Sequence, residues 1–395
     1  AGTVFHKVFF SQTGNGTTAL ILSYMSFAIG YIAGPFGAIF FGHIGDRKGR
    51  KVTMYASLLM MGISTSIIGI LPPAASAGVG VVIVLQLMRL AQCFGRGGTW
   101  GGGILMAYEN VPENKRSFYA AIPQIGLPIG FGLSSILIAV PTLLLPEDIF
   151  FTWGWRIPFL AAIILTLIVI RQKGEMMETE DYKKAQAKLE AEEAEGKKHK
   201  VGFIPMVKGY WKTLLLGCGT RWVDGTFYNI FIVWILSYCI NWLGMPLIQT
   251  YIITIIACIF KIPFTLFGGW CAQKLGNTRT FVIGALASAV LSIPTLKVIE
   301  LSKGNLAITI IGIVLGWSIA YNLIWAVISS LWSSYFETEV RYSGISFVYH
   351  VPSFLVAGMV PTICTLLINY GKGDTIYVGI YSTVVALISA ACALA

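Results

Sequence analysis

Charged side chains stand inside stretches of the chain that are otherwise apolar. One such stretch carries five polar or aromatic residues, spaced so that they share one face of a helix: Arg89, Gln92, Arg96, Thr99 and Trp100. Arg96 lies near the middle of this stretch, and no Asp or Glu lies one turn away from it. A charge that faces hydrocarbon costs at least about 2.5–3.5 kcal/mol, so this guanidinium must face a cavity or a partner.

Two later stretches carry similar faces. Arg221, Asp224 and Tyr228 follow one another at steps of three and four residues. A further stripe of polar and aromatic residues consists of Ser318, Tyr321, Asn322, Trp325 and Ser329. Arg221 and Asp224 either neutralise one another or face a ligand. The aromatic residues either pack against neighbouring helices or contact that ligand, and the spacing leaves both alternatives open.

The charges in these stretches are mostly positive. Arg89, Arg96 and Arg221 stand against a single aspartate, Asp224. Lys261 also lies in an apolar stretch, and we expect its long side chain to reach the aqueous edge. Because guanidinium groups bind carboxylates in bidentate geometry, the sequence predicts a binding site for a small organic anion. We expect Arg96 to hold the carboxylate, together with Arg221 or Arg89.

The composition indicates that membrane-spanning helices position these residues. Of the 395 residues, 56% are hydrophobic and only 12% are charged, whereas about 25% are charged in soluble proteins. So few charges cannot cover the surface of a soluble protein of this size. The net charge of +10 is spread over short clusters between apolar stretches, which is typical of membrane loops and not of a nucleic-acid site.

Eleven apolar stretches are long enough to cross a bilayer, which takes about 20 helical residues. They lie at residues 18–41, 52–71, 79–107, 117–141, 153–171, 209–240, 246–270, 280–300, 305–335, 342–370 and 375–395. We expect residues 1–10 to be the tail of one more span, which gives twelve. The long polar segment between the sixth and seventh spans contains a predicted charged helix at 178–195. The sequence therefore predicts an N-terminal six-helix bundle at 1–171, a linker at 172–207 and a C-terminal six-helix bundle at 208–395.

Alternate loops between these spans are rich in Lys and Arg, whereas the intervening loops hold almost none. The basic loops contain Arg47, Lys48, Arg50 and Lys51, then Lys115 and Arg116, then the linker, then Lys274 and Arg279, then Arg341. By the positive-inside rule, these loops face the cytoplasm. The linker and the C-terminus are expected on the same side.

The loop at residues 42–51 reads GHIGDRKGRK, and it resembles the hallmark loop of the major facilitator superfamily. Four further segments resemble the metabolite:proton symporter family within it: RLAQ at 89–92, GGTWGG at 97–102, WGWRIPF at 153–159 and EVRYSG at 339–344. That family includes transporters for shikimate, 2-oxoglutarate, citrate and proline or betaine. KRSFY at 115–119 and PQIG at 123–126 favour its shikimate-like branch.

This resemblance covers nearly the whole chain and implies an all-α integral membrane protein, monomeric, in the plasma or inner membrane. It implies two six-helix bundles around a central cavity lined by the first, fourth, seventh and tenth helices. The polar faces lie on the last three of these helices, so we expect substrate to contact Arg96, Arg89, Gln92, Thr99, Trp100, Arg221, Tyr228, Tyr321, Asn322 and Trp325. The residues expected to gate the cytoplasmic side are Asp46, Arg47, Arg50, Glu109, Arg116, Glu337 and Arg341, with Glu109 pairing with Lys115 or Arg116.

Three positions depart from the family pattern. Thr99 stands where the family has Glu, and Gly34 stands where it has Arg. Gln273 replaces the Asp expected in the second copy of the loop signature. The family's acidic first helix is expected to lie ahead of residue 1. These departures leave three alternatives open: proton symport through Asp224, proton symport through His350, and uniport.

The predicted function is secondary transport of a small organic carboxylate by alternating access, with proton symport as the expected coupling. One alternative is a carrier of a zwitterionic osmolyte such as proline or betaine, whose quaternary ammonium Trp100, Tyr228 and Trp325 would enclose. Another is a sensor that binds a metabolite without transporting it. An enzyme is not expected, because the sequence shows no metal cluster, nucleophile–base pair or phosphate loop. No catalytic residue, metal ligand or cofactor is therefore predicted.

Overall fold

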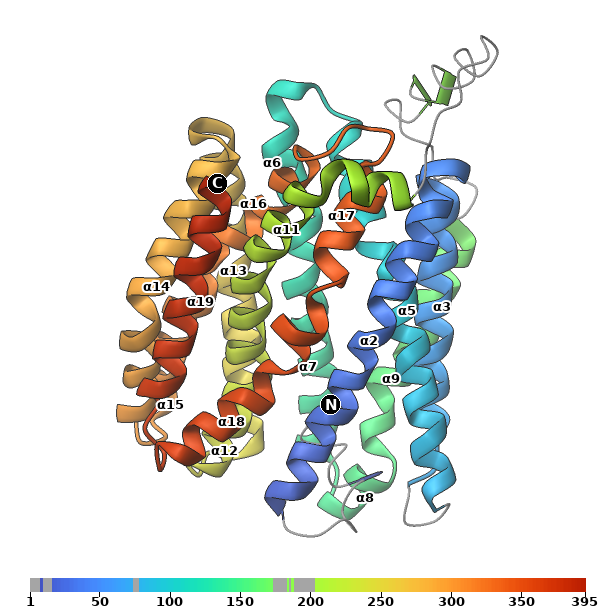
Figure 1. Ribbon diagram of the computed structural model, residues 1–395. Helices are drawn as coiled ribbons and strands as arrows, with labels where there is room; N and C mark the ends of the chain where they lie inside the picture. The colour runs from blue at the N-terminus through green and yellow to red at the C-terminus, as the bar shows by residue number, and fades with distance from the viewer. Residues whose placement is uncertain (1–7, 10–15, 74–77, 173–182, 185, 188–202) are drawn as a thin grey trace.

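The computed structural model describes residues 8–9, 16–73, 78–172, 183–184, 186–187 and 203–395. Every regular element within these ranges is helical, and the long helices run side by side between two ends of the molecule (Figure 1). We call residues up to 172 the N-terminal half and residues from 203 onward the C-terminal half. In Figure 1 the N-terminal half lies mainly to the right and the C-terminal half to the left.

The helices of the N-terminal half are α2 (Gly16–Lys48), α3 (Arg50–Ile70), α5 (Val79–Glu109), α6 (Arg116–Ala121), α7 (Gly126–Leu144), α8 (Glu147–Thr152) and α9 (Ile157–Arg171). Short 3₁₀ turns occur at η1 (Glu113–Lys115), η2 (Pro123–Ile125) and η3 (Gly154–Arg156). The C-terminal half consists of α11 (Phe203–Tyr228), η5 (Asn229–Trp234), α12 (Ile235–Asn241), α13 (Leu247–Leu275), α14 (Asn277–Leu301), α15 (Leu306–Ile313), η6 (Val314–Ala320), α16 (Asn322–Ser333), α17 (Arg341–His350), η7 (Phe354–Gly358), α18 (Val360–Tyr370) and α19 (Ile376–Leu394).

All eleven predicted spans are confirmed as helical. Nine stretches of the described residues are long and apolar enough to cross a membrane. The other two predicted spans fall in α2 and α5, which are 33 and 31 residues long. Of the predicted first-helix tail only Val8 and Phe9 are described, and both are buried. Most of the predicted charged helix at 178–195 lies outside the described residues, so the division into two bundles and a linker stays a prediction.

Several predicted spans are interrupted helices. The span predicted at 117–141 is divided into α6 and α7, because Pro123 lacks the N–H that would continue the backbone hydrogen-bond ladder. Three spans of the C-terminal half each contain a π-helical segment: η5, η6 and η7. π-helical turns are rare in proteins overall, and a large share of those that occur lie at functional sites. η5 follows Tyr228 directly and η6 ends just before Tyr321, so these segments adjoin the polar faces found in the sequence.

The helices α2 and α5 touch through their backbones. A Cβ atom built on Gly37 would lie 2.0 Å from the carbonyl oxygen of Phe94, and one built on Gly97 would lie 2.4 Å from the backbone nitrogen of Ala38. Only glycine fits at such distances. This contact fixes the rotation of α5, and therefore the direction in which Arg96 points.

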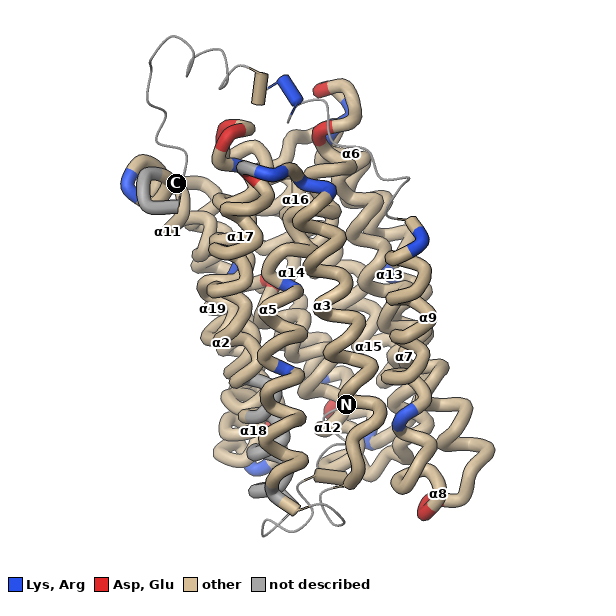
Figure 2. The backbone as a smooth tube through the Cα atoms, turned by 90° about the vertical axis from the view of Figure 1, so that its right-hand side faces the viewer, with Lys and Arg blue, Asp and Glu red and all other residues tan. Residues whose placement is uncertain are grey.

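The charged residues gather mainly at the two ends of the helices (Figure 2). We call the end that carries Lys51, Lys115, Lys274 and Arg279 the basic end. Large apolar side chains cover the middle of the outer surface; Val290 in the middle of α14, for example, is 73% exposed. An apolar belt between two charged ends is the surface that a bilayer requires.

The α2–α5 contact predicts a strong response to one added methyl group. Gly37→Ala should destabilise the protein by about 1–3 kcal/mol, because the new Cβ meets a backbone carbonyl that cannot rotate away. Gly130→Ala is the matched control, since no atom lies within 4 Å of a Cβ built on Gly130 in α7. Thermal unfolding followed by fluorescence-detected size exclusion would measure both variants. Equal melting temperatures for the two would contradict the close contact.

Candidate functional site: a cavity between the two halves

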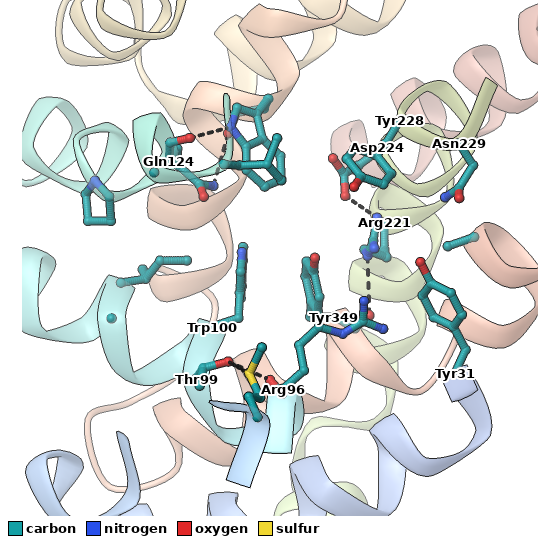
Figure 3. A pocket seen from close by; sticks show the side chains of 18 of the residues that line it. Tyr31, Arg96, Thr99, Trp100, Gln124, Arg221, Asp224, Tyr228, Asn229 and Tyr349 are labelled. Carbon is teal, nitrogen blue, oxygen red and sulfur yellow. Dashed lines mark hydrogen bonds and ion pairs between the residues drawn. The ribbon is translucent and has the colours of Figure 1, made fainter. Parts of the chain in front are cut away.

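A cavity of about 550 Å³ lies between the two halves. Its walls come from α2, α3, α5, η2 and α7 on one side and from α11, η5, α16, α17 and η7 on the other. The polar and aromatic side chains that line it are Tyr31, Arg96, Thr99, Trp100, Gln124, Arg221, Asp224, Tyr228, Asn229, Trp325 and Tyr349 (Figure 3). Six of the ten residues predicted to contact substrate are among them: Arg96, Thr99, Trp100, Arg221, Tyr228 and Trp325.

Arg96 provides the positive charge on the side of the N-terminal half. Its guanidinium carbon lies 4.5 Å from the centroid of the Tyr31 ring. Its Nε and Nη2 atoms are buried, and neither has a hydrogen-bond partner among the described residues. The neighbouring Thr99 donates its hydroxyl hydrogen to the carbonyl oxygen of Arg96 at 3.1 Å, so that hydroxyl is satisfied within the helix. Arg96 therefore keeps donors to offer to a bound molecule.

Arg221 faces the same cavity from the C-terminal half, but its charge is paired with a carboxylate and its Nε and Nη1 atoms have partners. Its Nη1 forms an ion pair with Oδ2 of Asp224, one helical turn away. Its Nε donates to the carbonyl oxygen of Tyr349 at 3.3 Å, and its guanidinium carbon lies 4.3 Å from the centroid of the Tyr349 ring. The other carboxylate oxygen of Asp224 accepts a hydrogen bond from the hydroxyl of Tyr321. Arg221 and Asp224 thus neutralise one another.

Aromatic rings from the two halves meet at the wall of the cavity. The rings of Trp100 and Tyr349 are stacked across the two halves, with centroids 4.2 Å apart and planes 20° apart. Trp332 lies against Trp100 at 5.3 Å. Because Arg221 covers the other face of Tyr349, this ring is held between a residue of each half. The stack is therefore a contact between the two halves at the cavity wall.

A second bridge joins the two halves at η2 and α16. The side-chain amide of Gln124 donates to the carbonyl oxygen of Trp325 at 3.2 Å, and the indole Nε1 of Trp325 donates to the carbonyl oxygen of Gln124 at 3.0 Å. One turn further along, the hydroxyl of Ser329 donates to the carbonyl oxygen of Ala120 at 2.9 Å. These reciprocal bonds place the Trp325 indole at the cavity wall.

The remaining predicted site residues do not line the cavity. Gln92 donates to Thr65 of α3 at 2.7 Å, and Arg89 is buried beside α2. His350 is fully buried, and its Nδ1 would lie 3.2 Å from a Cβ built on Gly34. Tyr321 and Asn322 turn towards the core of the C-terminal half. Only some residues of each polar helical face therefore line the cavity, and the others pack against neighbouring helices.

The expectation that Lys261 reaches the aqueous edge was wrong. Its side chain is 0% exposed, and its Nζ donates to Oδ1 of Asn322 at 2.8 Å. The rings of Trp317 and Tyr321 lie around the ammonium, with centroids 4.5 and 4.4 Å from Nζ. A polar amide and aromatic faces stabilise a buried cation, so this lysine has partners inside the protein.

A network of polar side chains at the basic end ties the two halves together. Nη2 of Arg50 donates to the carbonyl oxygen of Thr338 at 3.0 Å. Oδ2 of Asp46 accepts from the backbone nitrogen of Ser343 at 3.3 Å and from its hydroxyl. Nη1 of Arg341 donates to Oε1 of Glu109 at 3.1 Å. Three of the predicted gating residues of the N-terminal half thus contact the C-terminal half.

The partners of some gating residues differ from the expectation. Glu109 is bound by Arg50 and Arg341, and not by Lys115 or Arg116, because its side chain at the end of α5 is buried in the contact between the halves. Arg116 instead lies 3.8 Å from the exposed Glu113. Glu337 is exposed, and the side chain of Arg47 lies outside the described part of the chain.

The second copy of the loop signature uses an amide at the same end. Oε1 of Gln273 accepts a hydrogen bond from the backbone nitrogen of Phe118 at 3.3 Å, and its Nε2 donates to the carbonyl oxygen of Asn114. A carboxylate could accept the first bond but could not donate the second. The departure from the family pattern at Gln273 therefore suits a contact between the halves that needs both a donor and an acceptor.

Two sets of polar contacts at the opposite end connect elements of the same half. Arg156 donates to the carbonyl oxygen of Leu71 at 2.9 Å within the N-terminal half. Lys297 binds Glu300 at 3.0 Å and Asp374 at 2.7 Å within the C-terminal half. The hydrogen bond from the Lys297 ammonium lowers the pKa of the Asp374 carboxyl group, which lies in the loop between α18 and α19. These bonds brace each half separately.

Four polar or aromatic lining residues were not predicted: Tyr31, Gln124, Asn229 and Tyr349. Asn229 and Tyr349 are direct neighbours of the predicted residues Tyr228 and His350, so a wider helical face would have included both. Gln124 lies in the PQIG segment, where its match to the family suggested no contact. Tyr31 stands in an apolar stretch without another polar residue one turn away, and the sequence offers no signal for it.

Comparison with known proteins identifies the family of this chain. The family model described as Major Facilitator Superfamily matches residues 8–361. The inner membrane metabolite transport protein YhjE of Escherichia coli (strain K12) is 34% identical over 389 residues, which cover 97% of this chain and 85% of that protein. The shikimate transporter of the same strain is 30% identical over 401 residues, which cover 100% of this chain and 88% of that protein.

More distant matches agree with these. The proline/betaine transporter of Salmonella typhimurium (strain LT2) is 28% identical over 384 residues, covering 97% of this chain and 76% of that protein. The proton:xylose symporter XylE bound to 6-bromo-6-deoxy-D-glucose has the same fold, with a TM-score of 0.76 at 17% identity, covering 100% of this chain and 90% of that chain. The family resemblance and the all-α membrane fold predicted from the sequence are confirmed. The chain therefore belongs to the major facilitator superfamily, as a multi-pass membrane transporter of metabolites.

Proposed function

We propose that this protein is a secondary transporter of a small organic anion, a carboxylate, which it moves by alternating access. The observation that carries this proposal is Arg96, whose guanidinium lines the cavity with two donors that lack a hydrogen-bond partner among the described residues. A carboxylate supplies two acceptors in the geometry of that group. The similarity to a shikimate transporter supports the same class of substrate, since shikimate is a carboxylate.

A zwitterionic osmolyte is the main alternative, and relatives named as proline/betaine transporters support it. Such a substrate needs a group that attracts its cation as well as one that binds its carboxylate. Asp224 is the carboxylate that lines the cavity wall on α11, and both its oxygens are occupied, by Arg221 and Tyr321. Of the aromatic residues expected to enclose an ammonium group, Trp100 is covered by Tyr349. These contacts favour an anion.

Alternating access requires that the contacts at the basic end separate. By the positive-inside rule this end faces the cytoplasm of a monomer in the inner membrane, with the linker and the C-terminus on the same side. The bonds of Arg50, Asp46 and Glu109 to the C-terminal half hold the cytoplasmic side shut. Opening must also part the Trp100–Tyr349 stack. A sensor that does not transport would need no such separable contacts.

The coupling residue that we propose is Asp224. It lines the cavity, whereas His350 is fully buried and does not. A proton that reaches the cavity can therefore reach Asp224 without a change in the packing of the helices. Protonation would cancel the attraction between Asp224 and Arg221, which links the binding of a proton to the charge of the site.

Replacing Arg96 should weaken transport of the anion. Arg96→Gln is expected to raise the KM for uptake of labelled shikimate into proteoliposomes at least about ten-fold, because hydrogen bonds to a charged group contribute about 1.5–3 kcal/mol. Arg279→Gln, at an exposed arginine of the basic end, is the matched control. Uptake of betaine and proline should be measured in parallel. Unchanged kinetics for Arg96→Gln, or uptake of betaine in preference to carboxylates, would refute the proposed substrate class.

If the polar contacts at the basic end hold the two halves together, weakening them should open the cytoplasmic side more often. Asp46→Asn removes the negative charge that pairs with Arg50 at 3.6 Å and that accepts from Ser343. In a cysteine-free background, a cysteine placed at Ser346 should then react about ten-fold faster with a membrane-impermeant maleimide added at the cytoplasmic side. Asp148→Asn, at the opposite end, should leave the rate unchanged. Equal labelling of the two variants would show that Asp46 does not hold the halves together.

The coupling proposal predicts which variant loses its response to a pH gradient. Asp224→Asn cannot bind a proton, so an inward proton gradient should no longer drive uptake, while exchange of labelled for unlabelled substrate continues. His350→Gln should keep the gradient response. Accumulation driven by a pH gradient in Asp224→Asn proteoliposomes would exclude Asp224 as the coupling residue, and the absence of any gradient effect in the unmodified protein would indicate uniport.

A further inference from the structure

We propose that the site accepts one carboxylate only, on the side of the N-terminal half, and that Asp224 is the residue that excludes a second. This inference rests on the proposed function, because it specifies the substrate within the class of organic anions. It concerns selectivity and not coupling. It follows from a difference between the two guanidinium groups that reach the cavity.

The two guanidinium groups face one cavity from opposite halves. Arg96 comes from α5 and Arg221 from α11, and Figure 3 shows both side chains beside Tyr31 and Tyr349. Two cations arranged in this way would suit a dicarboxylate, with one carboxylate for each half. The partners of each group decide whether both cations are available.

Arg221 is less able than Arg96 to bind a carboxylate of the substrate. Its Nη1 is bound to Asp224, its Nε donates to the backbone of Tyr349, and its face lies on the Tyr349 ring. In contrast, Nε and Nη2 of Arg96 have no hydrogen-bond partner among the described residues. A carboxylate that enters the cavity therefore meets a charge at Arg96 that is unpaired within the described part of the chain. At Arg221 it meets a cation that Asp224 already neutralises, and a bond to Nη1 would have to displace Asp224.

Displacing Asp224 would be costly because this side chain is held from two directions. Arg221 binds one carboxylate oxygen and the hydroxyl of Tyr321 binds the other. Asp224 is only 1% exposed, so little water is available to replace these partners. Breaking a buried ion pair leaves an uncompensated charge, which is strongly unfavourable. A second carboxylate near Arg221 would also be repelled by Asp224 itself.

Lys261, another buried cation of the C-terminal half, cannot bind a second carboxylate in place of Arg221. Lys261 does not line the cavity, and its ammonium is bound by Asn322 within the C-terminal half. Apart from the Arg221–Asp224 pair, the residues of the C-terminal half that line the cavity are uncharged: Tyr228, Asn229, Trp325, Tyr349 and Ala357. The substrate therefore has its one carboxylate at Arg96 and an uncharged remainder towards α11 and α16.

A matched pair of ligands tests this selectivity. Cyclohexanecarboxylate and trans-cyclohexane-1,4-dicarboxylate share one ring and differ by one carboxylate, and calorimetry would give the Kd of each for the purified full chain. The unmodified protein should bind the monocarboxylate at least about ten-fold more tightly. In Asp224→Asn this preference should fall about ten-fold or reverse, because Arg221 then becomes available to the second carboxylate.

Two further variants keep the test decisive. The double variant Asp224→Asn/Arg221→Gln should lose the gain in dicarboxylate binding, which a general loosening of the site would not predict. If Asp224→Asn does not fold, Asp224→Ser takes its place. The comparison of the two Kd values on the unmodified protein needs no variant at all.

The outcomes separate this inference from the proposed function. Equal or tighter binding of the dicarboxylate by the unmodified protein would overturn the inference and leave the organic-anion proposal standing. An unchanged preference in Asp224→Asn would overturn the role of Asp224. Failure of both ligands to bind any form would overturn the proposed function, and this inference with it.

Discussion

The arrangement of this protein depends on one constraint: a positive charge placed within the membrane must have a partner or water. Four cations of the interior meet this constraint differently. Arg221 has Asp224, and Lys261 has Asn322 with a ring of aromatic side chains. Arg50 binds backbone carbonyls and Glu109. Arg96 faces the cavity with donors unused, and this difference marks it as the site at which the protein meets an anion.

The sequence predicted the elements better than it predicted their contacts. The spans and the family could be read from apolar stretches and loop signatures, because a bilayer imposes a minimum helix length and leaves charges only in the loops. The polar faces of α5 and α11 were also recognised, since helical spacing is a local property. Which part of each face meets the cavity could not be read, because it depends on the rotation that contacts such as Gly37 with Phe94 impose on a helix.

Three of the residues that were missed or misjudged depend on contacts between distant segments. Lys261 was assigned to the aqueous edge because its partner Asn322 lies 61 residues away in the sequence. Gln124 reaches the site through reciprocal bonds with Trp325 in the other half. Glu109 binds Arg341, 232 residues away, and Arg50 of α3, and not the nearby Lys115 or Arg116. Local spacing carries no information about such pairs.

The C-terminal half contains π-helical segments, and the described helices of the N-terminal half contain none. These segments affect how the side chains of the C-terminal half can be rearranged. A π-helical turn holds one more residue than the α-helical turn it replaces, so it can slide along a helix by one residue without breaking the helix. Successive residues of an α-helix differ by about 100° in direction, so each such slide would swing a different set of side chains towards the centre. Asn229 of η5 and Ala357 of η7 line the cavity, so a slide of either segment would change which side chains of the C-terminal half face it.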